Sequence, residues 1–256
     1  MIQIDLSGKV AVITGGSGEL GRVMVRTLAR SGADVAIHYH ANTEQADGLL
    51  NEIDEMDVRA IKVQADITEE SSVLAMRDTI KATLGSPHII VNNAVIQYPW
   101  MSVLEQPIED YESQFRSCVL QNVLMAKAFA PEMIKAKYGR IIAINSECSM
   151  QNFPGQSAYV SGKRGMDGML RVLAKEVGEH NITVNQVAPG WTISDKDRNY
   201  KPLIPRRNPY AKTVPLRRRG EDQEIANAVA FLASDLASFI TGAYIPVCGG
   251  NVMPAI

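Results

Sequence analysis

The stretch at residues 9–21, KVAVITGGSGELG, runs from an apolar segment into a glycine-rich turn and decides the fold. Residues 9–14 predict a buried strand, and residues 20–30 predict a helix because their apolar side chains recur at helical spacing. A strand, a glycine turn and a helix in this order form the unit that binds the pyrophosphate of a dinucleotide, since the backbone admits close approach and the first helical N–H groups face the anion. A turn that merely needs positive φ angles is the alternative explanation.

The rest of the chain repeats this alternation of β-branched runs and longer amphipathic stretches. Strands are predicted at residues 34–39, 58–63, 88–91, 140–145, 181–187 and 243–247, and helices at 43–56, 71–84, 108–137, 157–179 and 221–232. Strict alternation predicts a parallel sheet with helices on both faces. We therefore expect a single α/β domain over residues 1–256, a doubly wound Rossmann sheet in a three-layer αβα arrangement.

Composition excludes several classes of protein. The 256 residues are 46% hydrophobic and 21% charged, which excludes a disordered chain, and the net charge of −2 argues against a nucleic-acid partner. No apolar run approaches the roughly 20 residues of a membrane span, and no leader segment is recognisable, so no membrane partner is expected. Three cysteines without a CxxC pair indicate free thiols and a cytoplasmic protein, and the spacing of the four histidines indicates no metal.

One segment breaks the alternation. Residues 191–220 contain four prolines and nine Lys or Arg against two Asp, and they show no periodicity. A long irregular segment in a compact domain is usually functional, so we expect a substrate lid over about residues 191–220. Basic side chains here suit an anionic substrate or an acidic carrier protein, and a solvated face or a subunit contact is the alternative. They include Lys196, Arg198, Lys201, Arg206 and Arg207.

Tyr159 and Lys163 open the helix predicted at residues 157–179. At a spacing of four they share one helix face, and a nearby ammonium lowers the pKa of a tyrosine from its ordinary value of about 10. Such a pair serves as general acid and base on an alcohol or ketone, although surface pairs of this kind are common. Ser146 favours the catalytic interpretation, because it follows a strand at the sheet edge where ligands bind and its hydroxyl can bond a substrate carbonyl.

The end of the second strand indicates which dinucleotide is bound. NAD-binding folds carry an acidic residue there for the ribose 2′-hydroxyl, but this strand ends in HYHAN and no carboxylate follows before Glu44. The sequence therefore favours NADP(H), with His40 and Asn42 as donors to the 2′-phosphate, and NAD(H) is the alternative.

Taken together, these residues resemble the short-chain dehydrogenase/reductase family over nearly the whole chain, most closely its 3-oxoacyl-carrier-protein reductase-like and sugar- or polyol-dehydrogenase members. The motifs are the glycine turn at 14–21, Asp66, Asn92-Asn93-Ala94, Ser146 thirteen residues before Tyr159, Lys163, Pro189-Gly190 and the run at 240–250. The resemblance implies a seven-stranded sheet in the order 3-2-1-4-5-6-7 and a homotetramer, with a homodimer as the alternative. It also implies an oxidoreductase that transfers a hydride between NADP(H) and a small carbonyl or secondary alcohol.

The resemblance further implies a role for each candidate residue. Tyr159 exchanges the proton, Lys163 lowers its pKa and holds the nicotinamide ribose, and Ser146 steadies the carbonyl. The residues expected to bind the coenzyme are Gly15, Ser17, Gly18, Glu19, Leu20, Gly21, His40, Asn42, Asp66, Ile67, Asn93, Ala94, Tyr159, Lys163, Pro189, Gly190, Thr192 and Ser194. The side chains expected to wall the substrate site are Gln97, Tyr98, Trp100, Glu147, Met150, Phe153 and Trp191.

Three positions depart from the family pattern. Glu19 stands where the usual turn has its middle glycine, and a carboxylate there repels a pyrophosphate unless it points to solvent. Val95 replaces the glycine that ends the Asn-Asn-Ala motif. Cys118 stands where the family has a catalytic asparagine that helps to hold a water, and Asn122, one helical turn on, is a weak substitute. These departures keep an alternative open, namely a catalytically weak nucleotide-binding or scaffold protein of the same fold.

Overall fold

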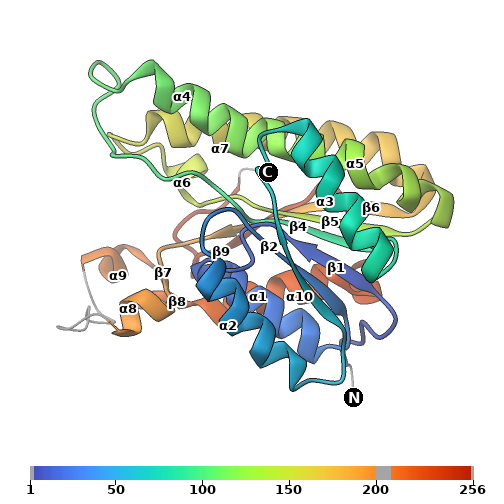
Figure 1. Cartoon of the computed structure of the whole chain (residues 1–256). Helices are drawn as coiled ribbons and strands as arrows, with labels where there is room; N and C mark the ends of the chain where they lie inside the picture. Colours follow the sequence, from blue (N-terminus) through green and yellow to red (C-terminus); the bar gives the residue numbers. More distant parts are fainter. Residues whose placement is uncertain (1–2, 200–208, 255–256) are drawn as a thin grey trace.

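Seven parallel strands form the central sheet of the computed structural model, which describes residues 3–199 and 209–254 (Figure 1). Their order is β3-β2-β1-β4-β5-β6-β9, the order that the family resemblance implied. The strands are β1 (Val10–Ile13), β2 (Asp34–Tyr39), β3 (Ala60–Gln64), β4 (Ile89–Asn92), β5 (Gly139–Ile144), β6 (Ile182–Pro189) and β9 (Tyr244–Val247). The central strands are buried apolar runs, as helices on both faces of a parallel sheet require.

Helices cover both faces of this sheet, so the molecule has three layers (Figure 1). One face carries α1 (Glu19–Arg30), α2 (Thr43–Asp54) and α10 (Asp222–Ala233), and the other carries α3 (Glu70–Thr83), α5 (Gln121–Ala136) and α7 (Ser157–Val177). Each face has its own apolar core, with Leu28 and Val229 in one and Phe129 and Met166 in the other. The predicted fold is confirmed. None of the helices in the described ranges is long and apolar enough to cross a membrane.

The helix predicted over residues 108–137 is interrupted by a wider turn. It consists of α4 (Ile108–Gln114), a π-helical turn (Phe115–Leu120) and α5. Two side-chain amides bind carbonyl groups of the turn: Gln121 donates to the Ser117 carbonyl, and Asn122 donates to the Cys118 carbonyl at 2.7 Å. The apolar pattern does not reveal this turn, because a single π turn shifts the helical register by only one residue.

Other differences from the prediction lie at boundaries and in short elements. β3 begins and ends later than expected, and α7 ends at Val177, where a 3-10 turn (Gly178–His180) follows. The elements that the sequence did not predict are α6 (Cys148–Gln151), β7 (Thr192–Ile193), α8 (Asp195–Asn199), α9 (Pro209–Thr213), β8 (Gly220–Glu221) and a 3-10 turn (Asp235–Ala237). Segments of this length are too short to show a period, and tertiary contacts decide their conformation.

Candidate active site

The candidate residues converge on the edge of the sheet where the parallel strands end (Figure 1). The glycine turn follows β1, Asn93 follows β4, Ser146 lies just after β5, and Pro189 ends β6. In an open α/β sheet, ligands bind outside this edge. The topology thus brings together residues that are far apart in the sequence.

The glycine turn leaves no room for side chains at two of its positions. Gly15 has a φ angle of +62°, and a Cβ atom there would lie 3.1 Å from the Ala94 Cα atom. A Cβ atom on Gly21 would lie only 2.0 Å from the Gly15 carbonyl oxygen. Ser17 and Gly18 belong to the same turn, which leads directly into α1, where Leu20 is the second residue. Glycines at these positions let a pyrophosphate approach the backbone closely, and the free N–H groups at the start of α1 can bind it.

Hydrogen bonds hold the end of β4 against this turn. The Asn93 side-chain amide donates to the carbonyl oxygens of Thr14 and Gly15 at 3.0 and 3.2 Å. The Thr14 hydroxyl accepts from the backbone N–H groups of Asn93 and Ala94 at 2.9 and 3.1 Å. Asn93 and Ala94 therefore lie beside the glycine turn.

The residues expected near the adenosine half follow β2 and β3. His40 and Asn42 are exposed, Ile67 is buried, and Asp66 is half-buried. The Asp66 carboxylate accepts from the Thr68 N–H and hydroxyl groups at 2.9 and 2.7 Å. Burial acts to raise the pKa of Asp66, but these hydrogen bonds hold it below its ordinary value, so the carboxylate is charged at neutral pH.

Ser146, Tyr159 and Lys163 are brought together at the centre of the edge. The Lys163 nitrogen lies 5.6 Å from the centre of the Tyr159 ring, and the Ser146 and Tyr159 hydroxyls are within hydrogen-bond reach. Lys163 is buried and donates to the Ile144 carbonyl at 2.6 Å, which ties α7 to the end of β5. The Tyr244 hydroxyl donates to the Ser146 carbonyl at 2.6 Å and so holds the serine backbone in place.

The structure reverses the pKa shift expected for Tyr159. Burial raises the pKa of Tyr159 above its ordinary value, and the hydrogen bond from Ser146 offsets only part of this effect. Burial also lowers the pKa of Lys163, whose ammonium is bonded to the Ile144 carbonyl. At neutral pH the Tyr159 phenol therefore keeps its proton.

Known proteins are similar to this chain in sequence and in fold. A family model described as Enoyl-(Acyl carrier protein) reductase matches residues 17–251. The 3-oxoacyl-[acyl-carrier-protein] reductase FabG of Pseudomonas aeruginosa is 36% identical over 251 residues, which cover 98% of this chain and 100% of the relative. The chain belongs to the short-chain dehydrogenase/reductase family.

Two further matches agree with this assignment. The 3-oxoacyl-[acyl-carrier-protein] reductase FabG of Staphylococcus epidermidis is 34% identical over 247 residues, which cover 96% of this chain and 99% of the relative. A solved short-chain dehydrogenase/reductase from Serratia marcescens, a double mutant, has a TM-score of 0.87 and 28% identity, with 96% of this chain and 98% of that one covered. The chain is thus an oxidoreductase that uses a nicotinamide coenzyme on CH–OH groups, as the sequence predicted.

A buried histidine of this short-chain dehydrogenase/reductase was not identified from the sequence. The His38 Nδ1 atom accepts from the Gly15 N–H at 2.9 Å, and its Nε2 atom lies 3.0 Å from the Ala65 carbonyl oxygen. These contacts require a neutral ring with its proton on Nε2. Burial lowers the pKa of His38 to about 4. Sequence gives no signal for this residue, since a lone histidine in an apolar strand has the pattern of an ordinary core position.

Acidification should therefore destabilise the protein through His38. Its pKa falls from 6.5 to about 4 on folding. Between these two pH values the unfolded chain binds the proton more readily than the folded chain, so the free energy of unfolding decreases as the pH is lowered. We expect this one group to remove about 2 kcal/mol between pH 7 and pH 5, measured by urea denaturation. The His38→Gln variant should lack this part of the pH dependence; equal slopes in the two proteins would contradict the assignment.

Glu19 is directed toward the lid segment (residues 191–220). Its carboxylate accepts the Lys196 N–H in α8 at 2.9 Å and lies 3.3 Å from the Arg22 guanidinium. The same guanidinium lies 3.4 Å from Asp195. The residue that replaces the family glycine therefore connects the start of α1 to α8, and its charge is shared with Arg22.

Cys118 is fully buried on the π-helical turn. The Cys118 backbone carbonyl accepts a hydrogen bond from the Asn122 side-chain amide at 2.7 Å. The Asn122 side-chain oxygen in turn accepts from the Asn92 side-chain amide at 2.6 Å. The thiol faces the Gln114 side chain at 3.8 Å. Asn122 is thus engaged with the backbone of residue 118 and with β4. Val95, the remaining departure, packs against the apolar core beside α5.

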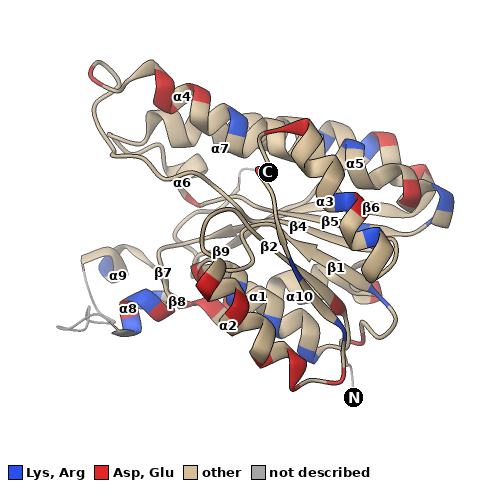
Figure 2. Ribbon diagram, in the orientation of Figure 1, with Lys and Arg blue, Asp and Glu red and all other residues tan. Residues whose placement is uncertain are grey.

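Arg198, a basic residue in the described part of the lid, is bound by carboxylates of the protein itself. Arg198 contacts Asp195, Glu221 and Asp222 at 2.9, 3.1 and 2.7 Å, and Figure 2 shows basic and acidic segments side by side on α8. Lys196 is exposed. The predicted residues Lys201, Arg206 and Arg207 lie outside the described residues. The Arg198 guanidinium therefore serves the lid itself, which favours the structural alternative for this residue.

The remaining predicted residues follow β6 or belong to the expected substrate wall. The Gly190 N–H donates to the Val247 carbonyl at 3.1 Å, the Thr192 hydroxyl donates to the Gly190 carbonyl at 2.8 Å, and the Ser194 N–H contacts Asp197 at 3.3 Å. Exposed or half-buried members of the expected substrate wall are Gln97, Tyr98, Trp100, Met150, Phe153 and Trp191. Glu147, in contrast, is buried. The Tyr98 hydroxyl accepts the Tyr159 backbone N–H and so contacts the first turn of α7.

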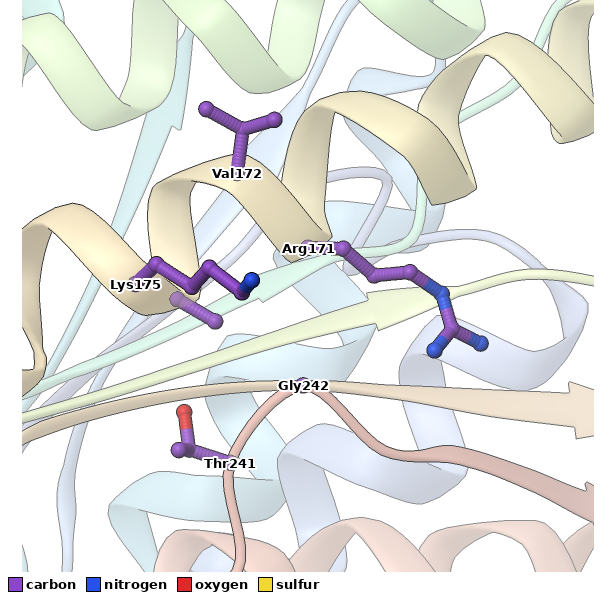
Figure 3. Close-up of a pocket in the computed structure, with 6 residues that line it drawn as sticks. Arg171, Val172, Lys175, Thr241 and Gly242 are labelled. Atoms are coloured by element: carbon purple, nitrogen blue, oxygen red, sulfur yellow. The ribbon is translucent and has the colours of Figure 1, made fainter.

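A separate hollow of about 690 Å³ lies beside the far half of α7 (Figure 3). Its lining residues are Arg171, Val172, Ala174, Lys175, Thr241 and Gly242. Arg171 is twelve residues beyond Tyr159 on the same helix, a rise of roughly 18 Å, so this hollow is distinct from the candidate active site. Within residues 3–199 and 209–254, no three His, Cys, Asp or Glu side chains gather closely enough to hold a metal ion.

Proposed function

We propose that this chain is an NADP(H)-dependent carbonyl reductase of the 3-oxoacyl type, with Tyr159 as the proton donor. The observation that carries the proposal is the meeting of Ser146, Tyr159 and Lys163 beside the glycine turn. The relatives named 3-oxoacyl-[acyl-carrier-protein] reductase support the substrate class. The family model is described as an enoyl reductase, and the ketone is favoured here because the curated relatives are named as 3-oxoacyl reductases.

The residues present fit a nicotinamide dinucleotide. The close backbone at Gly15 and Gly21 and the start of α1 suit the pyrophosphate. Asp66, Ile67, Asn93 and Ala94 would hold the adenosine half, and the turn at residues 189–192 would brace the nicotinamide. When bound, the coenzyme supplies the hydride for reduction. His40 and Asn42, with no carboxylate between them and β2, support a 2′-phosphate and therefore NADP(H).

The chain's own residues would orient the ketone and deliver the proton. The Ser146 hydroxyl donates to the carbonyl oxygen and fixes its position, since the serine backbone is held by Tyr244. As negative charge develops on that oxygen, the neutral Tyr159 phenol donates its proton to it. The buried Lys163 ammonium then stabilises the phenolate that remains. The raised pKa of Tyr159 keeps the proton on the phenol at neutral pH, so the group is in the protonation state that reduction requires.

Assembly and location are part of the proposal. The family resemblance supports a homotetramer or homodimer of one-domain subunits, each with a substrate lid over about residues 191–220. The free thiols of Cys118, Cys148 and Cys248 support a reducing, cytoplasmic environment. Sedimentation of the purified protein tests the subunit number.

Coenzyme titration followed by a turnover assay tests the function. We expect NADPH to bind about tenfold more tightly than NADH by fluorescence, a difference of about 1.4 kcal/mol. The enzyme should oxidise NADPH when a 3-oxoacyl thioester is added, and it should not do so with the matching enoyl thioester. Coenzyme binding without turnover on either thioester or on a panel of sugar and polyol ketones would favour the catalytically weak alternative that Glu19, Val95 and Cys118 suggest.

A further inference from the structure

A buried carboxylate next to Ser146 joins three parts of the chain. Glu147 is 3% exposed. Its Oε1 atom accepts the Tyr210 hydroxyl of α9 at 2.7 Å, and its Oε2 atom accepts the Asn251 amide at 3.0 Å. The Glu147 N–H donates to the Pro189 carbonyl at 3.0 Å. One side chain thus ties the lid helix α9 and the C-terminal segment to the strand end that carries Ser146.

The Tyr210 hydroxyl is shared between this carboxylate and the turn after β6. It donates to Glu147 and accepts the Trp191 N–H at 3.0 Å. Gly190 leaves the space for it, because a Cβ atom on Gly190 would lie 2.5 Å from the Tyr210 oxygen. The Trp191 and Tyr210 rings meet edge to face, with their centres 5.6 Å apart. Tyr210 therefore occupies a niche built by the same turn that is expected to brace the nicotinamide.

The charges strengthen these contacts. Burial raises the pKa of Glu147, while the hydrogen bonds from Tyr210 and Asn251 favour its ionised form. Burial and the neighbouring carboxylate raise the pKa of Tyr210, so the phenol remains a donor across the neutral range. Hydrogen bonds to a charged acceptor in a buried site are stronger than neutral ones.

We propose that Glu147 and Tyr210 form a latch that holds α9 and the turn at residues 189–192 in place for the substrate. Both are positioning residues, because they act through the lid and the turn and not on the reacting atoms. Their effect on turnover rests on the proposed function. With the latch broken, only a fraction of molecules has α9 and the turn at residues 189–192 in place, and the apparent affinity for substrate is reduced in proportion to that fraction.

The Tyr210→Phe variant tests the latch by removing a single oxygen. We expect KM for the ketone to rise about tenfold while kcat falls less than about threefold, since the lost hydrogen bond is remote from the carbonyl. The Tyr138→Phe variant is the matched control: it makes the same change at the opposite end of β5 and should leave both constants unchanged. Equal KM values for Tyr210→Phe and the wild type would overturn the proposal.

A donor swap separates the latch from a general packing role. In Glu147→Gln one acceptor becomes a donor, which then opposes the Asn251 amide, so KM should rise as in Tyr210→Phe. In the double variant E147Q/N251D the new amide meets a new carboxylate, and the Gln carbonyl still accepts from Tyr210. KM should return to within about threefold of the wild type. A double variant as impaired as E147Q would overturn the proposal, even if Tyr210→Phe failed to fold.

Fluorescence provides a readout that does not depend on turnover. The chain has two tryptophans, so a Trp100→Phe background leaves Trp191 as the single reporter. Loss of the Tyr210 hydroxyl should shift the Trp191 emission to longer wavelength and increase its quenching by acrylamide. If the wild type shows no carbonyl reduction, the proposed function fails, but the Trp191 fluorescence still tests whether the latch exists. An unchanged Trp191 spectrum in Tyr210→Phe would contradict it.

Discussion

Replacing Tyr159 by phenylalanine should lower kcat/KM for carbonyl reduction about 1,000-fold, equivalent to about 4 kcal/mol of transition-state stabilisation. The phenol lies within reach of the Ser146 hydroxyl and keeps its proton at neutral pH, because burial raises its pKa. The ring remains, so its contact with Trp100, 6.3 Å between ring centres, is retained. Steady-state NADPH oxidation with a saturating 3-oxoacyl thioester measures the effect.

The control for this variant is coenzyme affinity. No part of the glycine turn contacts the Tyr159 hydroxyl in the described structure, so the dissociation constant for NADPH should change less than about threefold. The melting temperature should also stay close to that of the wild type, because the substitution preserves the ring. Activity within tenfold of the wild type would rule out Tyr159 as the proton donor.

Adding one methyl group at Gly21 should weaken NADPH binding about 100-fold and lower the free energy of unfolding by about 3 kcal/mol. The Cβ atom of alanine would lie 2.0 Å from the Gly15 carbonyl oxygen and 2.9 Å from the Gly16 Cα atom. Both neighbours are backbone, so the turn itself must move. Fluorescence titration and urea denaturation of Gly21→Ala measure the two effects.

Gly48→Ala is the matched control for that prediction. Gly48 is exposed within α2, and nothing lies within 4 Å of a Cβ atom there. Alanine has the higher helix propensity, so this variant should gain up to about 1 kcal/mol of stability and bind NADPH normally. Normal coenzyme binding by Gly21→Ala would show that the turn is not the pyrophosphate site.

Sequence reasoning predicted the sheet and the meeting of Ser146, Tyr159 and Lys163 because both depend on local signals. The strands are short apolar runs between turn residues, and Tyr159 and Lys163 need only helical spacing to share a face. Ser146 and Asn93 could be placed because the ends of parallel strands meet at one edge of the sheet. The order of the strands and motifs along the chain was thus enough to predict that these residues meet.

Contacts between distant segments were beyond the reach of the sequence. Tyr210 and Asn251 meet Glu147 only through the folding of the lid segment and the C-terminal segment, and no spacing rule links them. The pKa of Tyr159 was predicted in the wrong direction, because the spacing gives the distance to Lys163 but not the depth of burial. The π-helical turn was missed because Gln121 and Asn122 stabilise it through side chains that also suit an ordinary helix.

The lid helices α8 and α9 are fastened to the protein body independently, α8 through Glu19 and Arg198 and α9 through Tyr210. Because the two anchors share no residue, each helix can be released by itself. Removal of the Glu19 carboxylate should loosen α8 and leave α9 in place, and removal of the Tyr210 hydroxyl should do the reverse.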